Sequence, residues 1–218
     1  MNAARIAIAA LTLAIFGGSL AGAAPKKTVT TTTTTIGGWT IQATETDMNL
    51  ASGAFAVPHP FTMTRLDGST VNADRAVGNY KKKQAVLYGH VSVHDANGTF
   101  GLHSAQPAHH DPATLTADTL KIDDASHLYD ADGNVHYVQG QTTADADTAH
   151  LNDVTHRLDL SGKVHVVQGE RTLDAQTATY NIATGDGEAD GNAMMTFPGG
   201  TASIATPKPI IIRGPKIP

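Results

Sequence analysis

The chain has no cysteine, and of its 218 residues only 5% are aromatic and 16% are charged. The absence of cysteine excludes a disulfide scaffold, a thiolate zinc site, a cysteine nucleophile and a lipid-modified N-terminal cysteine. Fifteen lysines and arginines against twenty aspartates and glutamates give a net charge of −5, which disfavours nucleic acid as a partner. The length fits one ordinary domain, or at most two small ones.

The first 23 residues have the features of a secretory signal peptide. Arg5 precedes the apolar run Ile6–Phe16, and residues 21–23 supply the small side chains that a cleavage site requires. The apolar run is shorter than the roughly 20 residues of a membrane-spanning helix. We therefore expect residues 1–23 to be removed on export and the rest of the chain to act outside the cytoplasm.

Composition divides the remaining chain into three parts. Residues 24–36 form a threonine-rich leader with little to bury, which predicts an extended or mobile segment. Residues 37–197 carry the pattern of a folded domain, and residues 198–218 form a tail rich in proline and glycine. The apolar triplet Ile210–Ile212 within this tail either folds back as a capping strand or lies disordered.

A repeat organises most of the predicted domain. Each unit begins with an alanine followed by an aspartate or a glutamine. A glycine stands fifteen residues after the second residue of this pair. The pairs are Ala73-Asp74, Ala117-Asp118, Ala146-Asp147 and Ala175-Gln176, and the glycines are Gly89, Gly133, Gly162 and Gly191. Asn79, Asp123, Asn152 and Asn181 stand ten residues before these glycines and predict turns, because Asn and Asp tolerate left-handed backbone. Each unit is therefore expected to contain two extended segments joined by a turn.

The segment around each glycine alternates between apolar and polar residues. Leu160, Gly162 and Val164 share one predicted face, and Lys163 lies on the other, which is typical of a half-buried strand. The face that carries the glycines and alanines of the repeat is predicted to point inward. These small residues either leave space for a ligand between two sheets or let the sheets pack closely.

The segment before each turn also alternates between apolar and polar residues. This alternation shifts by one residue after the alanine-containing pair. In the second unit the inward positions step by three residues, from Ala117 to Leu120, which predicts a bend or bulge. A bent strand pair that recurs in every unit stacks into two facing, twisted sheets. The predicted fold is therefore all-β, an open and twisted β-jellyroll.

The third unit shows the repeated pattern most fully. It reads Ala146-Asp147-Thr148-Ala149, then an asparagine-containing turn, then Leu160-Ser161-Gly162-Lys163-Val164-His165-Val166 and Gln168-Gly169. This pattern resembles the OstA-like (LptA/LptC) family of periplasmic lipopolysaccharide-transport proteins, and the resemblance covers about Val71–Phe197. It implies an open β-jellyroll in the periplasm whose apolar interior holds the acyl chains of lipopolysaccharide or a similar lipid, without catalysis or a cofactor.

An acyl chain of about twelve methylenes loses on the order of 10 kcal/mol when it is moved into water, so a carrier must shelter it. The inward apolar residues of the repeat are the candidate lipid-binding residues. They are Leu87, Val91, Val93, Leu120, Ile122, Val135, Tyr137, Leu151, Leu158, Leu160, Val164, Val166, Tyr180, Met195 and Phe197.

An open stack of strands has unpaired edges at both ends, and such edges pair readily with other strands. We expect one end near Trp39–Val57 and the other near Ala189–Phe197 to pair with other jellyroll transport components, a second copy of this chain being one candidate.

The sequence gives little support to catalysis. It has no G-x-S-x-G elbow, no H-E-x-x-H motif and no P-loop, so neither a catalytic nor a metal site is predicted. Two histidines and an aspartate at residues 109–111 lie next to each other in one proline-flanked loop. A flexible cluster of this kind, without a third ordered ligand, is weak support for a zinc site. The recurrent aspartates are interpreted as corner residues. His90, His94, His136 and His165 are expected on the outer surface.

Two other classes of function stay open from the residues alone. One is an extracytoplasmic β-solenoid that binds or acts on polysaccharide, although the chain offers few aromatic side chains on which sugars stack. The other is a structural protein of the cell envelope whose interior is completely filled.

Overall fold

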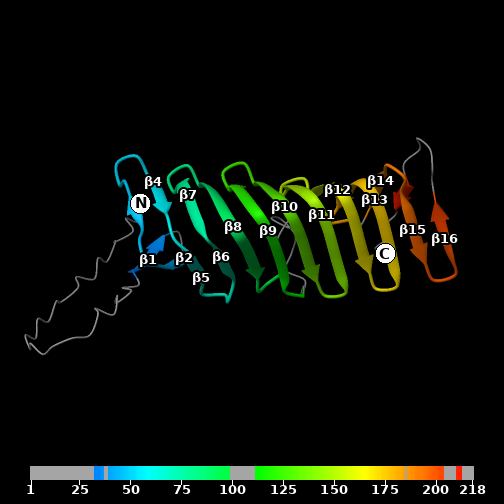
Figure 1. Ribbon diagram of the computed structural model, residues 1–218, viewed down its shortest axis with the longest axis horizontal. Coiled ribbons are helices and arrows are strands. Elements are labelled where there is room, and N and C mark those ends of the chain that lie inside the picture. The colour runs from blue at the N-terminus through cyan, green and yellow to red at the C-terminus, as the bar shows by residue number, and fades with distance from the viewer. Residues whose placement is uncertain (1–31, 37–38, 99–110, 185, 204–209, 213–218) are drawn as a thin grey trace, which may run out of the picture.

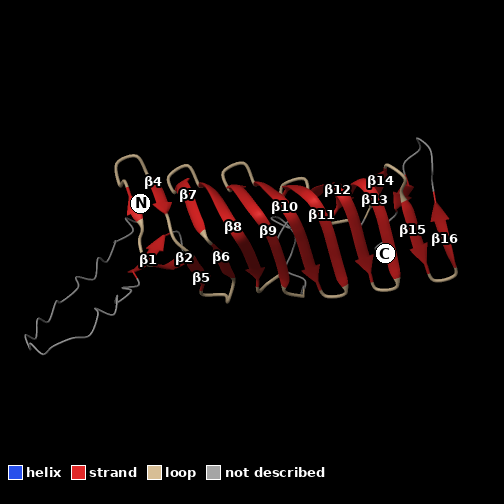
Figure 2. Cartoon of the chain, viewed as in Figure 1, coloured by secondary structure: helices blue, strands red, loops and turns tan. Residues whose placement is uncertain are grey.

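The computed structural model describes residues 32–36, 39–98, 111–184, 186–203 and 210–212. These residues contain strands and turns and no helix, so a helix able to cross a membrane is not found among them. The strands form one antiparallel sheet that is not closed into a barrel (Figures 1 and 2). The strands are β1 Thr32–Ile36, β2 Trp39–Ala43, β3 Asp47–Met48, β4 Ala54–Val57, β5 Phe61–Arg65, β6 Thr70–Ala73, β7 Arg75–Asn79, β8 Gln84–Asp95, β9 Ala113–Asp123, β10 Leu128–Gln139, β11 Thr142–Asn152, β12 Arg157–Gln168, β13 Arg171–Asn181, β14 Gly187–Asp190, β15 Met194–Phe197, β16 Gly200–Ser203 and β17 Ile210–Ile212. The predicted all-β, open jellyroll is confirmed.

The sheet folds over along a line of corners that crosses its long central strands β8 to β13. On one side of this line, half-sheet A contains β1, β2, β5, β6, one half of each central strand, β15 and β16. On the other side, half-sheet B contains β3, β4, β7, the other halves, β14 and β17. The two facing sheets expected from the sequence are thus halves of one continuous sheet, and buried residues of both halves form one core.

A β-bulge at the repeat glycine of β8, β10 and β12 makes the corner in each of these strands. In β12 the pairing with β13 shifts between Ser161 and Val164, because Gly162 and Lys163 lie opposite a single residue of the partner strand. Both have left-handed backbone, with φ of 76° and 49°. The same pairing shift occurs in β8 and in β10. The corner is therefore present in the central units as predicted, but the extra residue belongs to the glycine strand and not to the preceding one.

The glycines do not lie on the inward face, and this part of the prediction is wrong. A Cβ atom on Gly162 would lie 2.7 Å from the Cβ of Asp147, whose side chain is about half exposed. The glycine leaves room for the corner aspartate and not for a ligand. This close approach explains why the aspartate and the glycine recur at a fixed spacing. At the first and second corners, Asp74 and Asp118 crowd their glycines in the same way.

Each corner aspartate also contacts the residue that follows the glycine. The Nζ atom of Lys163 lies 3.0 Å from Oδ1 of Asp147, and the side-chain amide of Asn134 donates to Asp118 over 2.8 Å. The corresponding pair at the first corner is His90 with Asp74. The recurrent aspartates therefore stabilise the corners through side-chain contacts, which agrees with the interpretation from the sequence.

The predicted turns are present at the ends of the strands in half-sheet B, away from the corners. The Oδ1 atom of Asn152 accepts hydrogen bonds from the backbone N–H groups of Val154 and Thr155, over 3.1 and 3.0 Å. Asn79, Asp123 and Asn181 accept equivalent bonds in the other units. These Asx-type bonds fix where each strand ends and thus fix the pairing register on both sides of the turn.

Both ends of the sheet are covered by strands from segments that the sequence placed outside the domain. Thr32–Ile36, the end of the threonine-rich leader, pairs with β2. In the tail, Gly200–Ser203 pairs with β15, and Ile210–Ile212 pairs with β14 as a capping strand. Three of the four outermost strands, β1, β16 and β17, therefore lie outside the segments expected at the edges, whereas β3, the outermost strand of half-sheet B at its N-terminal end, belongs to Trp39–Val57 as expected. The predicted signal peptide, residues 24–31 of the leader and the loop with His109 and His110 lie outside the described residues.

Candidate functional site

A cavity of about 260 Å³ lies between half-sheets A and B, within the region from β9 to β15. The mouth lies opposite the line of corners, because the wall extends to the strand ends that the corners do not join. Gln139, Thr142 and Gln168 reach it from half-sheet A, and Tyr129 and Tyr180 reach it from half-sheet B. The arrangement is a trough whose closed edge is the row of glycine bulges.

Most predicted lipid-binding residues of the central units lie on the wall of this cavity. They are Leu120, Val135, Tyr137, Leu151, Leu158, Leu160, Val166, Tyr180 and Met195. Their contact with lipid stays a prediction. The structure brings them together because each lies on the inward face of its strand.

The other six predicted residues do not line the cavity. Leu87, Val91 and Val164 are at most 3% exposed and belong to the packed core. Val93 and Ile122 pack against that core, and Phe197 is 39% exposed at the end of β15. The alternation of the sequence assigns a residue to the inward face, but it does not show whether the space in front of that face is filled.

Several wall residues were missing from the predicted set. Leu115 and Leu173 lie directly opposite Tyr137 and Val166 in the register, so the same alternation indicated them. The space itself comes from small side chains. The alanines on the wall are Ala131, Ala144, Ala149 and Ala178. The sequence analysis placed alanines of the repeat on the inner face and left a cavity and close packing as alternatives.

Three tyrosines line the cavity, and burial raises the pKa of each phenol further above neutral pH. Burial raises the pKa of Tyr137 to about 12, and its hydroxyl donates to Oε1 of Gln139 over 2.8 Å. Burial also raises the pKa of Tyr129 and of Tyr180. A hydrogen bond from Gln168 acts against that rise in Tyr180. The phenols therefore add hydrogen-bonding groups to the apolar wall without adding charge.

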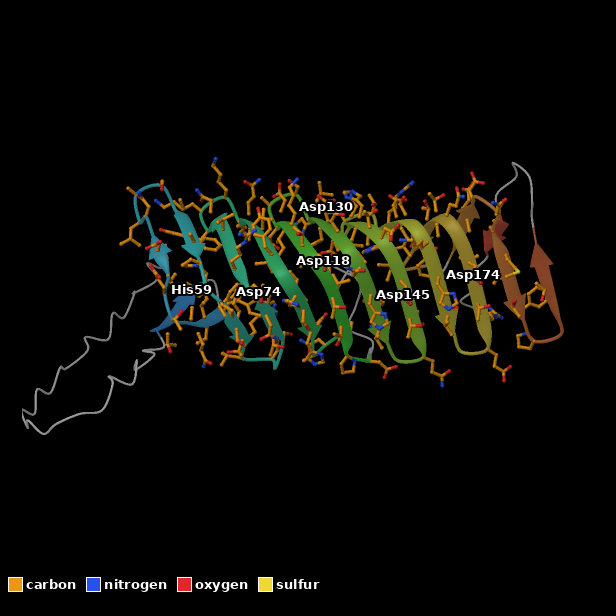
Figure 3. All side chains as sticks on the ribbon, in the orientation of Figure 1. His59, Asp74, Asp118, Asp130, Asp145 and Asp174 are labelled. Carbon is orange, nitrogen blue, oxygen red and sulfur yellow. The ribbon has the colours of Figure 1, made fainter. Side chains whose placement is uncertain are left out.

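The outer surface of half-sheet A carries a row of alternating histidine and aspartate on four neighbouring strands. The Nδ1 atoms of His136 and His165 lie 2.6 Å from Asp145 and Asp174, respectively. Figure 3 shows Asp145 and Asp174 at equivalent places on β11 and β13. Of the four histidines expected on the outer surface, these two share a row, and His94 contacts Thr114 in the neighbouring row, two residues further along the strands.

His90 lies at a corner, where the hydrogen bond to Asp74 and the charge of that carboxylate raise the pKa of the imidazole. In the part of the chain that the structure describes, no group of three acidic or histidine side chains is arranged to hold a metal ion. The outer carboxylates thus pair with neighbouring side chains and do not converge on one point.

Comparisons with known proteins find likeness among solved structures. No protein-family model matches the chain, and no curated protein matches it. Among solved structures, the chain is similar to LptH from Pseudomonas aeruginosa, described as the LptA homologous periplasmic component of a lipopolysaccharide transport device. The two share 19% sequence identity and a TM-score of 0.41, over 67% of this chain and 95% of LptH.

Proposed function

We propose that this protein is a non-catalytic carrier that shelters a hydrocarbon chain of an amphipathic lipid between half-sheets A and B. The observation that carries the proposal is the apolar cavity of about 260 Å³ at the place where the repeat directs its inward side chains. A packed protein interior leaves few voids larger than a water molecule. An unfilled space of this size with a predominantly apolar wall is therefore a binding site for apolar atoms.

The size of the cavity favours part of a lipid over a whole one. Sites that enclose a complete small ligand have volumes of about 300–1,000 Å³. The cavity is slightly smaller, and it is open at its mouth. A chain buried there gains about 0.8 kcal/mol per methylene, while the rest of the molecule stays outside. Lipopolysaccharide and related lipids, which the sequence resemblance implies, have this division into chains and headgroup.

The two alternative functions receive less support. A structural protein with a completely filled interior does not account for the cavity between β9 and β15. A polysaccharide-acting enzyme needs carboxylates that converge on a substrate. The carboxylates on the outer face are instead paired one by one, as Asp145 is with His136 and Asp174 is with His165.

We further propose a periplasmic location and transport toward the outer membrane, on the basis of the signal-peptide features and the repeat resemblance. Partners would add strands to the ends of the sheet, at β1 or at β16 and β17, and a second copy of this chain is one such partner. Light scattering tests the self-pairing form. A mass that rises with concentration is expected, and a constant monomer mass would contradict self-pairing.

The lipid-binding proposal is tested by titrating the protein with an uncharged dodecyl chain that carries an environment-sensitive fluorophore. The variant Ala149→Phe places a ring in the cavity, because Ala149 lies on the wall opposite Leu160 in the register. We expect its affinity for the probe to fall at least about tenfold, or about 1.4 kcal/mol. The matched control Ala51→Phe, in an exposed turn, leaves affinity unchanged.

A second variant keeps the test decisive if Ala149→Phe does not fold. Leu158→Gln sets an amide on the wall at a half-buried position, where it remains compatible with folding. We expect weaker probe binding from it as well. The proposal fails if the wild-type protein gives no fluorescence change, or if folded Ala149→Phe and Leu158→Gln both bind the probe as tightly as wild type.

A further inference from the structure

The inward face of half-sheet A changes chemistry in successive rows from the corner to the mouth. A middle row runs across neighbouring strands as Leu115, Tyr137, Ala144, Val166 and Leu173, all joined in the register. The next row outward is the last one before the turns. It contains Ala113, Gln139, Thr142, Gln168 and Arg171. The apolar wall thus ends in a polar rim.

Arg171 brings a positive charge to this rim. It is exposed, borders the cavity, and lies two residues from the buried Leu173, so both side chains share the inward face of β13. Among the described residues its guanidinium forms no ion pair. The exposed arginines Arg65 and Arg157, in contrast, are paired with Asp67 and Asp159 over 2.8 Å. An unpaired guanidinium beside an apolar cavity has five donors available for an anion.

Another polar residue of the rim, Gln139, already donates its side-chain hydrogen bonds to the backbone. The side-chain amide of Gln139 donates to the backbone oxygens of Gly98 and Asp111, over 2.9 and 3.0 Å. Gln168 lies opposite Arg171 in the register, and its amide acts to lower the pKa of Tyr180 in half-sheet B. The bonds of Gln139 hold one part of the rim in place, and Arg171 is the charged residue of this row.

The charge distribution around the cavity is one-sided. Glu188 is the acidic residue on the wall, and it belongs to β14 in half-sheet B, whereas Arg171 begins β13 in half-sheet A. An amphiphile with an anionic headgroup is therefore favoured at the rim of half-sheet A. Its chain would pass from Arg171 across the tyrosines to the alanines of the cavity, so that headgroup and chain each meet matching chemistry.

We infer that Arg171 anchors the anionic headgroup, a phosphate or a carboxylate, of an amphiphile whose chain occupies the cavity. The inference rests on the proposed function and adds a residue that determines specificity. A bidentate guanidinium contact with either anion is charge-assisted and directional. The residue selects for headgroup charge, while the apolar wall binds the chain whatever headgroup it carries.

The test is competition against the uncharged fluorescent probe, with dodecyl phosphate, dodecanoate and uncharged dodecyl maltoside as competitors at concentrations below micelle formation. In wild-type protein we expect dodecyl phosphate or dodecanoate to compete roughly tenfold better than dodecyl maltoside. Whichever of the two anions competes better identifies the headgroup chemistry. In Arg171→Gln this preference is lost, while affinity for dodecyl maltoside and for the probe is unchanged.

Two further variants separate charge from structure. Arg171→Lys keeps the charge without the planar fork, and it is expected to retain part of the preference for an anion. Lys82→Gln removes one positive charge from the exposed turn between β7 and β8 and leaves the preference intact. The inference is overturned if Arg171→Gln keeps the full preference, or if it weakens all three competitors equally.

The outcomes also distinguish this inference from the proposed function. Failure of the uncharged probe to bind wild-type protein would overturn both. Binding of the probe with no difference among the three competitors would leave the carrier proposal standing and would overturn only the role of Arg171.

Discussion

Between β2 and β7 large side chains pack into the interior of the folded sheet, whereas between β9 and β15 the same layering encloses a cavity. In the first region Phe61 is only 5% exposed, and Trp39, Phe55 and Met63 pack against the core. Both regions bury alanines, such as Ala43 and Ala73 in the first, but only those in the second border the cavity. The comparison shows that the cavity arises from side-chain volume on a common backbone plan, because both regions contribute to the same two half-sheets (Figure 1).

Glycine serves the two regions differently. In the first region Gly78 lies opposite Phe55, and a Cβ atom there would lie 2.4 Å from the backbone oxygen of Gln84 and 2.7 Å from the ring, so this glycine makes room for the neighbouring strand and for an aromatic side chain. In the second region Gly133 and Gly162 make room for corner aspartates and keep the long strands continuous through the fold. One residue type therefore helps to fill the interior at one end and to shape the trough at the other.

The largest expected effect that follows from this comparison is on stability in the filled region. Phe61→Ala removes a buried ring from a packed interior, and we expect the free energy of unfolding to fall by about 3–5 kcal/mol. Urea unfolding measures the change, with Phe61→Leu as a control that retains most of the volume. A loss below about 1 kcal/mol would mean that the first region is not packed as described.

A smaller effect is expected on the wall of the cavity. Leu158 is half-buried and faces space that is already empty, so Leu158→Ala removes fewer contacts and is expected to cost less than about 2 kcal/mol. The same urea titration compares it with Phe61→Ala. Equal losses for the two variants would contradict the distinction between a filled and an unfilled region.

The sequence predicted the strands and turns well because their causes are local. Period-two alternation, an Asx turn such as the one at Asn152, and a glycine that needs left-handed backbone at Gly162 each leave a signal within a few residues. The corner was also predicted from the slip between Ala117 and Leu120. Which strand holds the extra residue was not, because a bulge changes the pairing of two strands and is visible only in their register.

The site was predicted in part, for a related reason. Alternation placed Leu158 and Val164 on one inward face, but only packing between the half-sheets makes the first a wall residue and the second a core residue. Arg171 was not singled out, because a charged residue next to a turn normally indicates a solvated surface. The alternation that places Leu173 inward also places Arg171 there, but only the structure shows that the arginine borders a cavity.

Photocrosslinking to lipid from three positions tests the central claim most directly. A benzoylphenylalanine replaces Tyr137 on the cavity wall, Phe61 in the filled region, or Lys163 on the outer side of a corner. With a bound dodecyl lipid, we predict strong labelling from position 137 and none above background from positions 61 and 163. Equal labelling from positions 137 and 163, or none from position 137, would contradict a lipid-binding trough between the half-sheets.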